Sequence, residues 1–225
     1  MLYELVVAHY QENLNWLRKV PPAIHRRLYH KDSAHTESAG ILLPNEGREA
    51  HTYLHHIVER YDSLAEITVF SQGKPFDHAY DFHATLRKIA SNSEPIRPFE
   101  WLGHLIDTDD WEGRRLFQTW SKNEDGRGLD LKGFHQKVLG TDGPERYTFV
   151  LGAQFIIHRE IIQQKPKSFY QNALEVSIHF PDAAHCYERS WDKVFDVQGI
   201  PEEVLQGRET VYLKRMKNQQ ILNSE

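Results

Sequence analysis

Polar side chains suited to ligand binding follow the first apolar run of the sequence. Residues 3–8 are rich in β-branched side chains and predict a strand, and Tyr10 and Glu12 come directly after it. Because ligands of open α/β sheets bind at the carboxyl ends of strands, these two residues are candidates to hold a base and a ribose. The alternative is that Tyr10 packs internally and Glu12 only begins a helix, where the helix dipole favours a carboxylate.

A second candidate is the segment Asn45-Glu46-Gly47-Arg48-Glu49, at the start of the strongest helical pattern in the chain. Apolar side chains at helical spacing predict a helix over residues 47–61, with Asn45 as its N-cap. Free N–H groups, an arginine and a glycine at a helix N-terminus can receive a phosphate. The same pattern also fits a capped surface helix with Arg48 and Glu49 in solvent.

A third candidate follows the predicted strand at residues 67–70, where Gln72 and Gly73 precede Asp77-His78. A carboxylate and an imidazole suit a divalent metal, and a glycine lets the backbone approach a ligand. Asp77 is equally suited to cap a helix that begins at His78.

Two histidines at helical spacing, His51 and His55, suggest a shared metal of the zinc-hydrolase kind. The glutamate that would act as the general base beside the first histidine is replaced by Thr52. Together with Asp77 and His78, these histidines define the alternative of a metal-dependent hydrolase.

Three further features stand in the remainder of the chain. The run Asp107-Thr108-Asp109-Asp110 has Asp-X-Asp spacing, but no convincing strand precedes it, so a solvated loop is predicted. Glu188, beside the apolar Trp191, is a candidate general base whose pKa burial would raise, or else a structural hydrogen-bonding group. Cys186 has no activating neighbour and is predicted to be buried and inert.

The elements that must position these groups alternate between strand and helix, which predicts a parallel sheet. Beyond those already named, the patterns predict a helix-like segment that begins at Leu14 and stops at Pro21-Pro22, strands at 24–29 and 148–157, a capping box from Ser168 to Gln171, and a helix at 183–195. Residues 92–146 read as loops between short helices, and residues 201–225 as a helical tail. We therefore expect one domain over residues 1–225.

Composition narrows the function classes. The chain is 40% apolar and 26% charged, a composition typical of a folded globular protein. Its net charge of −5 provides no positively charged surface of the kind that binds nucleic acid. Its longest apolar stretch is well short of the roughly 20 residues of a membrane-spanning helix, so no transmembrane segment is expected. A single cysteine excludes an intrachain disulfide and suits the cytoplasm.

Taken in order, several motifs resemble a small family of proteins with a domain of unknown function (DUF3431-like), which is grouped with the GT-A glycosyltransferases. The residues that carry the resemblance are 6–13 with Trp16-Leu17, Tyr29-His30-Lys31, 43–54, Phe70-Ser71-Gln72-Gly73 with 75–78, Gly152-Ala153-Gln154-Phe155 with Arg159, and Glu188-Arg189-Ser190-Trp191 with Phe195. The resemblance extends over most of the chain. Two departures are His9, Gln11 and Asn13 in the first loop, and Ser71-Gln72-Gly73 where many GT-A enzymes place Asp-X-Asp.

The resemblance implies an α/β fold of the GT-A-like, Rossmann-like kind, with a mixed, mostly parallel sheet flanked by helices. It implies transfer of a sugar from a nucleoside diphosphate-sugar to a hydroxyl of a glycan or small-molecule acceptor, with Mn²⁺ or Mg²⁺ as cofactor. A non-catalytic nucleotide-binding protein of the same fold is a further alternative.

The roles that it implies fall on four groups of residues. They are Tyr10 and Glu12 for the nucleoside; Lys31 and Arg48 for phosphate, with Asn45 and Glu49 beside them; Gln72, Gly73, Gln154 and Arg159 for the nucleotide-sugar, with Asp77 and His78 for the sugar or a metal; and Glu188 or Asp77 as catalytic base.

Overall fold

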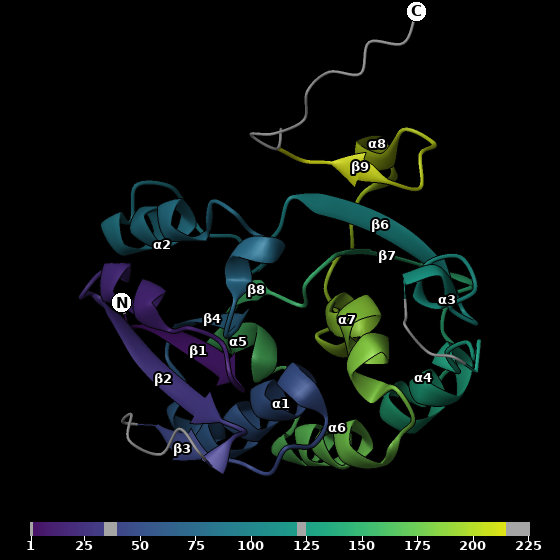
Figure 1. Ribbon diagram of the computed structural model, residues 1–225, viewed down its shortest axis with the longest axis horizontal. Helices are drawn as coiled ribbons and strands as arrows, with labels where there is room; N and C mark the ends of the chain where they lie inside the picture. Colours follow the sequence, from purple (N-terminus) through teal and green to yellow (C-terminus); the bar gives the residue numbers. More distant parts are fainter. Residues whose placement is uncertain (1, 34–39, 121–124, 215–225) are drawn as a thin grey trace, which may run out of the picture.

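A computed structural model describes residues 2–33, 40–120 and 125–214 (Figure 1). Its main sheet has six strands in the order β3-β2-β1-β4-β8-β5. Their bounds are β1 (Tyr3–His9), β2 (Ile24–His30), β3 (Ile41–Leu42), β4 (Ile67–Gln72), β5 (Phe99–Trp101) and β8 (Phe155–His158). The first four strands are mutually parallel and β8 is antiparallel to both of its neighbours. The expected mixed, mostly parallel α/β sheet is thus confirmed.

The chain order creates a switch point in this sheet. From β1 the chain moves outward through β2 and β3, and α1 (Arg48–Arg60) then returns it to β4 on the other side of β1. The carboxyl ends of β1 and β4 consequently lie side by side, with His9 and Gln72 at the two strand ends. Such points are where open α/β sheets form ligand crevices.

Helices cover both faces of the sheet (Figure 1). One core joins the sheet to α1, α4 (Leu131–Leu139), α6 (Lys167–His179) and α7 (Ala183–Val194), and a second core joins it to η1 (Asn15–Lys19) and α2 (Phe82–Ser91). Alternation along β1 explains the division, because Val6 faces the first core while Leu5 and Val7 face the second.

Helix α1 forms where the periodicity predicts it. Ala50, Tyr53, Leu54 and Ile57 share a face and are fully buried. The helix begins at Arg48 with Gly47 in the N-cap position, however, so the expected cap by Asn45 is wrong. Arg48 has a φ of 49°, in the left-handed region that non-glycine residues seldom adopt.

The largest departure from expectation is the acidic run. Residues 107–110 lie in strand β6 (Leu105–Asp110), which pairs with β7 (Arg146–Val150) and β9 (Val211–Tyr212) in a second, antiparallel sheet. Asp107, Asp109 and Thr108 are buried, so the predicted solvated loop is wrong. Asp110 accepts backbone N–H groups of the residues that follow it, whereas Asp109 also pairs with the distant Arg189, as described below.

Other boundaries also differ from the sequence patterns. The strand expected at 148–157 is two strands, β7 and β8, separated by a turn that contains Gly152. Helix α6 begins at Lys167 after Pro166, so Ser168 lies within its first turn and makes no capping bond. Asp77 ends the short helix η4 (Pro75–Asp77), and α2 begins only at Phe82, so the helix cap proposed for Asp77 is absent.

The segment expected to be loops between short helices and the tail expected to be helical both contain strands. Residues 92–146 include β5, β6, α3 (Phe117–Trp120) and α4. The tail contains α8 (Glu202–Leu205) and then β9 rather than a continuous helix, and residues 215–225 lie outside the described residues. Within the described chain, no helix combines the length and apolar character needed to cross a membrane.

Candidate functional site

A cleft lies at the switch point of the main sheet, between the carboxyl ends of its parallel strands and the start of α1. It consists of two adjoining cavities of about 300 and 240 Å³ that share Arg48, Glu49 and Gln72. We call them the basic pocket and the indole pocket. The basic pocket is completed by Ala8, His9, Tyr10, Glu12, Lys31 and Asn45, and the indole pocket by His78, Leu116, Phe117, Trp120, Leu151, His185, Glu188 and Arg189.

Lys31 gives the basic pocket a buried ammonium group. The residue is only 7% exposed, and its Nζ donates to the carbonyl oxygens of Pro44 (3.3 Å) and Glu46 and to Nδ1 of His51 (3.1 Å). In the described chain no carboxylate lies within ion-pair distance of it, and burial lowers the pKa of Lys31 to about 8. A buried cation paired only with neutral groups favours an anion in the adjoining cavity.

Arg48 adds a second cation where the two cavities meet. Its Nη1 donates to Nε2 of His185 at 3.0 Å, so the partner is an imidazole rather than a carboxylate. Burial lowers the pKa of His185, opposed by Glu188 and reinforced by the guanidinium groups of Arg48 and Arg189. The positive φ of Arg48 places backbone strain at this point, as is common where a ligand is bound.

The loop after β1 forms one wall of the basic pocket. Oε2 of Glu12 accepts the backbone N–H of Tyr10 at 2.8 Å, and Trp16 Nε1 donates to the carbonyl oxygen of Gly73 at 2.8 Å. A Cβ on Gly73 would lie 2.5 Å from Oε2 of Glu12, so a larger residue there would displace the Glu12 carboxylate from its position in the loop. Tyr10 lines the basic pocket and is 43% exposed.

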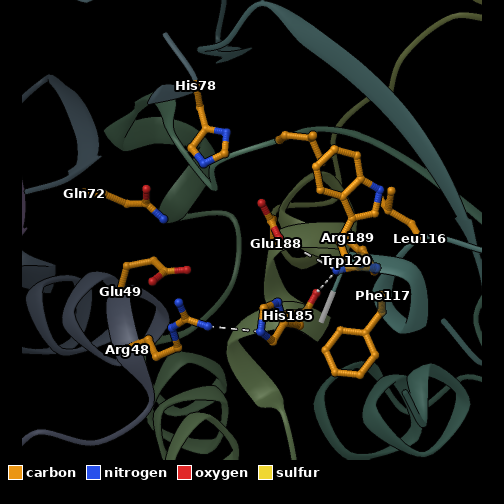
Figure 2. Close-up of a pocket in the computed structure, with 11 residues that line it drawn as sticks. Arg48, Glu49, Gln72, His78, Leu116, Phe117, Trp120, His185, Glu188 and Arg189 are labelled. Atoms are coloured by element: carbon orange, nitrogen blue, oxygen red, sulfur yellow. Dashed lines mark hydrogen bonds and ion pairs between the residues drawn. The ribbon is translucent and has the colours of Figure 1, made fainter. Parts of the chain in front are cut away.

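The indole pocket has walls of different polarity (Figure 2). Leu116, Phe117 and Trp120 stand on one side of it, and Arg48, Glu49 and Gln72 on the other. Glu188 and His185 project from α7 between the two sides, and His78 points in from above in this view.

Glu188 is held by a backbone donor from a distant turn. Its Oε1 accepts the N–H of Gly152 at 2.7 Å, and its Oε2 lies 3.7 Å from Nη1 of Arg189. Gly152 has a φ of 103°, and a Cβ there would lie 2.5 Å from the side chain of His78. One glycine therefore orients the carboxylate and makes room for the imidazole.

A buried ion pair fixes the apolar wall relative to this carboxylate. Oδ2 of Asp109 on β6 accepts from Nε (2.9 Å) and Nη2 (2.8 Å) of Arg189. The carboxylate of Asp109 also accepts the backbone N–H groups of Leu116 (2.9 Å) and Phe117 (3.1 Å), at the start of α3. The acidic strand thus joins α3 to the helix that carries Glu188.

Glu49 is the carboxyl group shared by both cavities. It forms no ion pair or side-chain hydrogen bond with another residue of the described chain. Burial, opposed by Arg48 and reinforced by Glu188, raises the pKa of Glu49. A carboxyl group of this kind is suited to exchange a proton or to bind a hydroxyl group.

The structure brings most of the predicted binding residues together. Those that line the cleft are Tyr10, Glu12, Lys31, Asn45, Arg48, Glu49, Gln72, His78 and Glu188. Gly73 lies directly beside it, and Gln154 supports it, since the buried amide of Gln154 accepts from Ser71 at 3.3 Å and donates to the carbonyl of Pro75 at 3.1 Å.

Two predicted residues lie elsewhere. The side chain of Asp77 is 56% exposed and pairs with Lys74 at 3.0 Å, outside both cavities. Arg159 follows β8, whose antiparallel direction carries it to the amino end of β4, where it donates to the carbonyl of Leu64 at 3.2 Å.

The suggested zinc ligands are not assembled either. His51 Nδ1 faces the ammonium of Lys31, and burial together with Lys31 lowers the pKa of His51 to about 4. Within residues 2–33, 40–120 and 125–214, no three His, Cys, Asp or Glu side chains are grouped so as to hold a metal.

Sequence reasoning missed three residues of the indole pocket as functional candidates, namely Trp120, His185 and Arg189. Arg189 had been noted only as part of a motif. His185 contacts Arg48, 137 residues away in the sequence, and Arg189 contacts Asp109, 80 residues away. No local sequence pattern connects either pair. The position of Arg189 directly after the candidate base Glu188, in a predicted helix, was the available signal.

Comparison with known proteins gives one family match, over residues 5–100. No curated protein and no solved structure shows a significant similarity to the chain. The motifs suggested that the family resemblance extends over most of the chain. The match is shorter than that, because the segments with Gly152 and Glu188 lie beyond it. Residues 5–100, which contain β1, β2, α1 and β4, match the family described as "Protein of unknown function (DUF3431)".

Proposed function

We propose that the protein is a GT-A-like glycosyltransferase that moves a sugar from a nucleoside diphosphate-sugar to an acceptor hydroxyl. The observation that carries the proposal is the position of Lys31 and Arg48, two cations without carboxylate partners in the described chain, at the switch point of a mostly parallel sheet. A diphosphate is the anion class that such a crevice accepts in doubly wound folds.

The two cavities divide the substrate accordingly. Tyr10 and Glu12 contact the nucleoside, with the exposed ring of Tyr10 stacking on the base and Glu12 near the ribose. Lys31 and Arg48 neutralise the diphosphate and stabilise the charge that develops on it as it leaves. The transferred sugar then lies beside Gln72 and Glu49, where the cavities join.

Glu188 is the proposed catalytic base. As the acceptor oxygen forms a bond to the anomeric carbon, the bond from that carbon to the diphosphate oxygen breaks, and the acceptor proton passes to the carboxylate of Glu188. The N–H of Gly152 orients this carboxylate, and the Arg189–Asp109 pair fixes its helix. Asp77, the other candidate base, lies outside the cleft and receives no role.

The predicted ligands do not fit a shared Mn²⁺ or Mg²⁺ at the diphosphate. Asp77 is turned to Lys74 in solvent, and Gln72 and Gly73 supply no carboxylate at the loop where GT-A enzymes place Asp-X-Asp. No step of the proposal is assigned to a metal, and Lys31 and Arg48 provide the positive charge instead.

A thermal-shift screen tests the binding part of the proposal. The purified protein is heated with nucleoside diphosphates and their sugars, with and without Mn²⁺. A ligand at 100 times its Kd adds about 2.7 kcal/mol, which raises the Tm of a domain of this size by about 5–10 °C. We expect one nucleotide class to give this shift, and Arg48→Gln to weaken its binding about 10- to 100-fold.

Arg114→Gln is the matched control, because Arg114 is an exposed arginine outside the cleft that pairs with Glu112. The proposal is wrong if no nucleotide shifts the Tm, or if Arg48→Gln and Arg114→Gln respond to nucleotide alike.

A further inference from the structure

The indole pocket presents an aromatic side chain to solvent at an unusual degree of exposure. Trp120 is 73% exposed, the highest value among the exposed large hydrophobic residues of the described chain. It lies at the end of α3 and lines the cavity together with Phe117, Leu116 and Leu151. An exposed indole on the rim of a polar cleft is typical of a ligand platform.

The contacts that anchor the helix of Trp120 support the same interpretation. The helix of Trp120 starts at backbone N–H groups that are bound by Asp109, and the same carboxylate is paired with Arg189, the neighbour of Glu188. The start of the short helix that carries Trp120 is therefore fixed relative to the proposed base.

The opposite walls indicate the chemical class of the ligand. A pyranose ring has an apolar C–H face, which suits an aromatic ring, and a hydroxyl edge, which suits carboxylate and imidazole groups. The apolar wall offers Trp120 and Phe117, while Glu188, His185 and His78 offer hydrogen-bonding groups across the same cavity (Figure 2).

We propose that the indole pocket binds a saccharide acceptor, stacked on Trp120 with one hydroxyl directed at Glu188. This inference rests on the proposed function, which leaves the acceptor class open. It places the nucleoside at the other end of the cleft, beside Tyr10, and excludes it from Trp120.

Ligand-observed saturation-transfer NMR of the full chain tests the inference. The probes are methyl glucoside, methyl galactoside, methyl mannoside, cellobiose and maltose, each titrated in the absence of nucleotide. We expect at least one to bind, with affinity reduced at least about tenfold in Trp120→Ala.

Trp111→Ala is the matched control and should bind the saccharide as the wild-type protein does. Trp111 is also exposed, at 41%, but lies outside the cleft, with Lys132 over its ring. The affinity for nucleoside diphosphate should be unchanged in both variants.

Failure of the inference and failure of the proposed function give different results. If no saccharide binds, or if Trp120→Ala binds it as the wild type does, the saccharide pocket is wrong even where nucleotide still binds at Lys31 and Arg48. Loss of nucleotide affinity in Trp120→Ala alone also overturns it, because the indole then holds the base. If a saccharide binds in a Trp120-dependent way but no nucleotide binds, the saccharide site is supported and the proposed glycosyltransferase function is wrong.

Discussion

The backbone N–H of Gly152 donates a 2.7 Å hydrogen bond to Oε1 of Glu188, and the same glycine leaves no room for a Cβ beside His78. The turn between β7 and β8 therefore affects the positions of two polar groups of the indole pocket, Glu188 and His78. The backbone at Gly152 is therefore important for the geometry of the cleft, although the charged side chains of the cleft come from other parts of the chain.

Gly152→Ala should lower both stability and activity. Its φ of 103° is unfavourable for alanine, and the added Cβ would lie 2.5 Å from His78. The backbone strain alone should lower the free energy of unfolding by about 1–3 kcal/mol. Urea unfolding measures this loss. Gly140→Ala is the control, because Gly140 also has a positive φ, 72°, but nothing within 4 Å of a Cβ. Equal losses of saccharide binding or transfer in both variants would show that contact with His78 and Glu188 is unimportant.

Arg189→Met should be strongly destabilising. It leaves the carboxylate of Asp109 buried without its cation, which costs about 3–5 kcal/mol. Arg114→Met removes a solvent-exposed pair with Glu112 and should cost less than about 1 kcal/mol. Denaturant midpoints at one pH compare the two variants, and a small effect of Arg189→Met would mean that the ion pair does not hold β6 to α7.

Stability should fall as the pH drops below 6.5. Burial is the first cause that lowers the pKa values of His51, His56 and His135, from 6.5 to about 4, 3 and 4. The unfolded chain therefore binds more protons than the folded chain between these values. Each histidine then contributes a stability that is complete above pH 6.5 and decreases by up to about 1.4 kcal/mol per pH unit below it.

His135→Phe tests this pH dependence, because neither ring nitrogen of His135 has a hydrogen-bond partner in the described chain. The slope of the unfolding free energy between pH 4.5 and 6.5 should decrease by the contribution of one histidine. His179→Gln, at a side chain that is 74% exposed, is the control. An unchanged slope in His135→Phe would contradict the assignment.

Nucleotide binding should take up a proton above pH 8. Burial lowers the pKa of Lys31 to about 8, and a diphosphate beside the ammonium raises it again. Affinity should therefore weaken as the pH rises from 7.5 to 9.5, and calorimetry in two buffers of different ionisation enthalpy should detect the proton. Lys31→Met should bind more weakly and without this pH dependence. Identical pH profiles for the two proteins would exclude Lys31 from the phosphate site.

The sequence predicts the strands and the helix at the switch point better than it predicts the elements that form the apolar side of the indole pocket. Apolar runs and a helical period correctly predicted β1, β4 and α1, because their burial follows from local pattern. The strand at residues 107–110 was misjudged because the cation that pairs with the buried carboxylate of Asp109 comes from a remote part of the chain. Arg189 lies 80 residues after Asp109, and a pairing over that distance leaves no local signal.

The candidate residues follow the same division. Those next to predicted strand ends, such as Tyr10 and Gln72, do line the cleft, since the carboxyl ends of parallel strands meet at one edge. Asp77 was chosen by residue type, and the short helix η4 turns it to Lys74 and solvent. Trp120 required knowledge of how β6 and α3 pack against α7.

Release of nucleoside diphosphate from a panel of nucleoside diphosphate-sugars, followed by mass spectrometry with the saccharide probes present, tests the central claim most directly. We expect one donor class to be consumed with formation of a glycosylated saccharide. Glu188→Gln should slow this turnover by about 10²- to 10⁴-fold while nucleotide still binds. Release from no donor, or release at an equal rate in Glu188→Gln, would contradict the account.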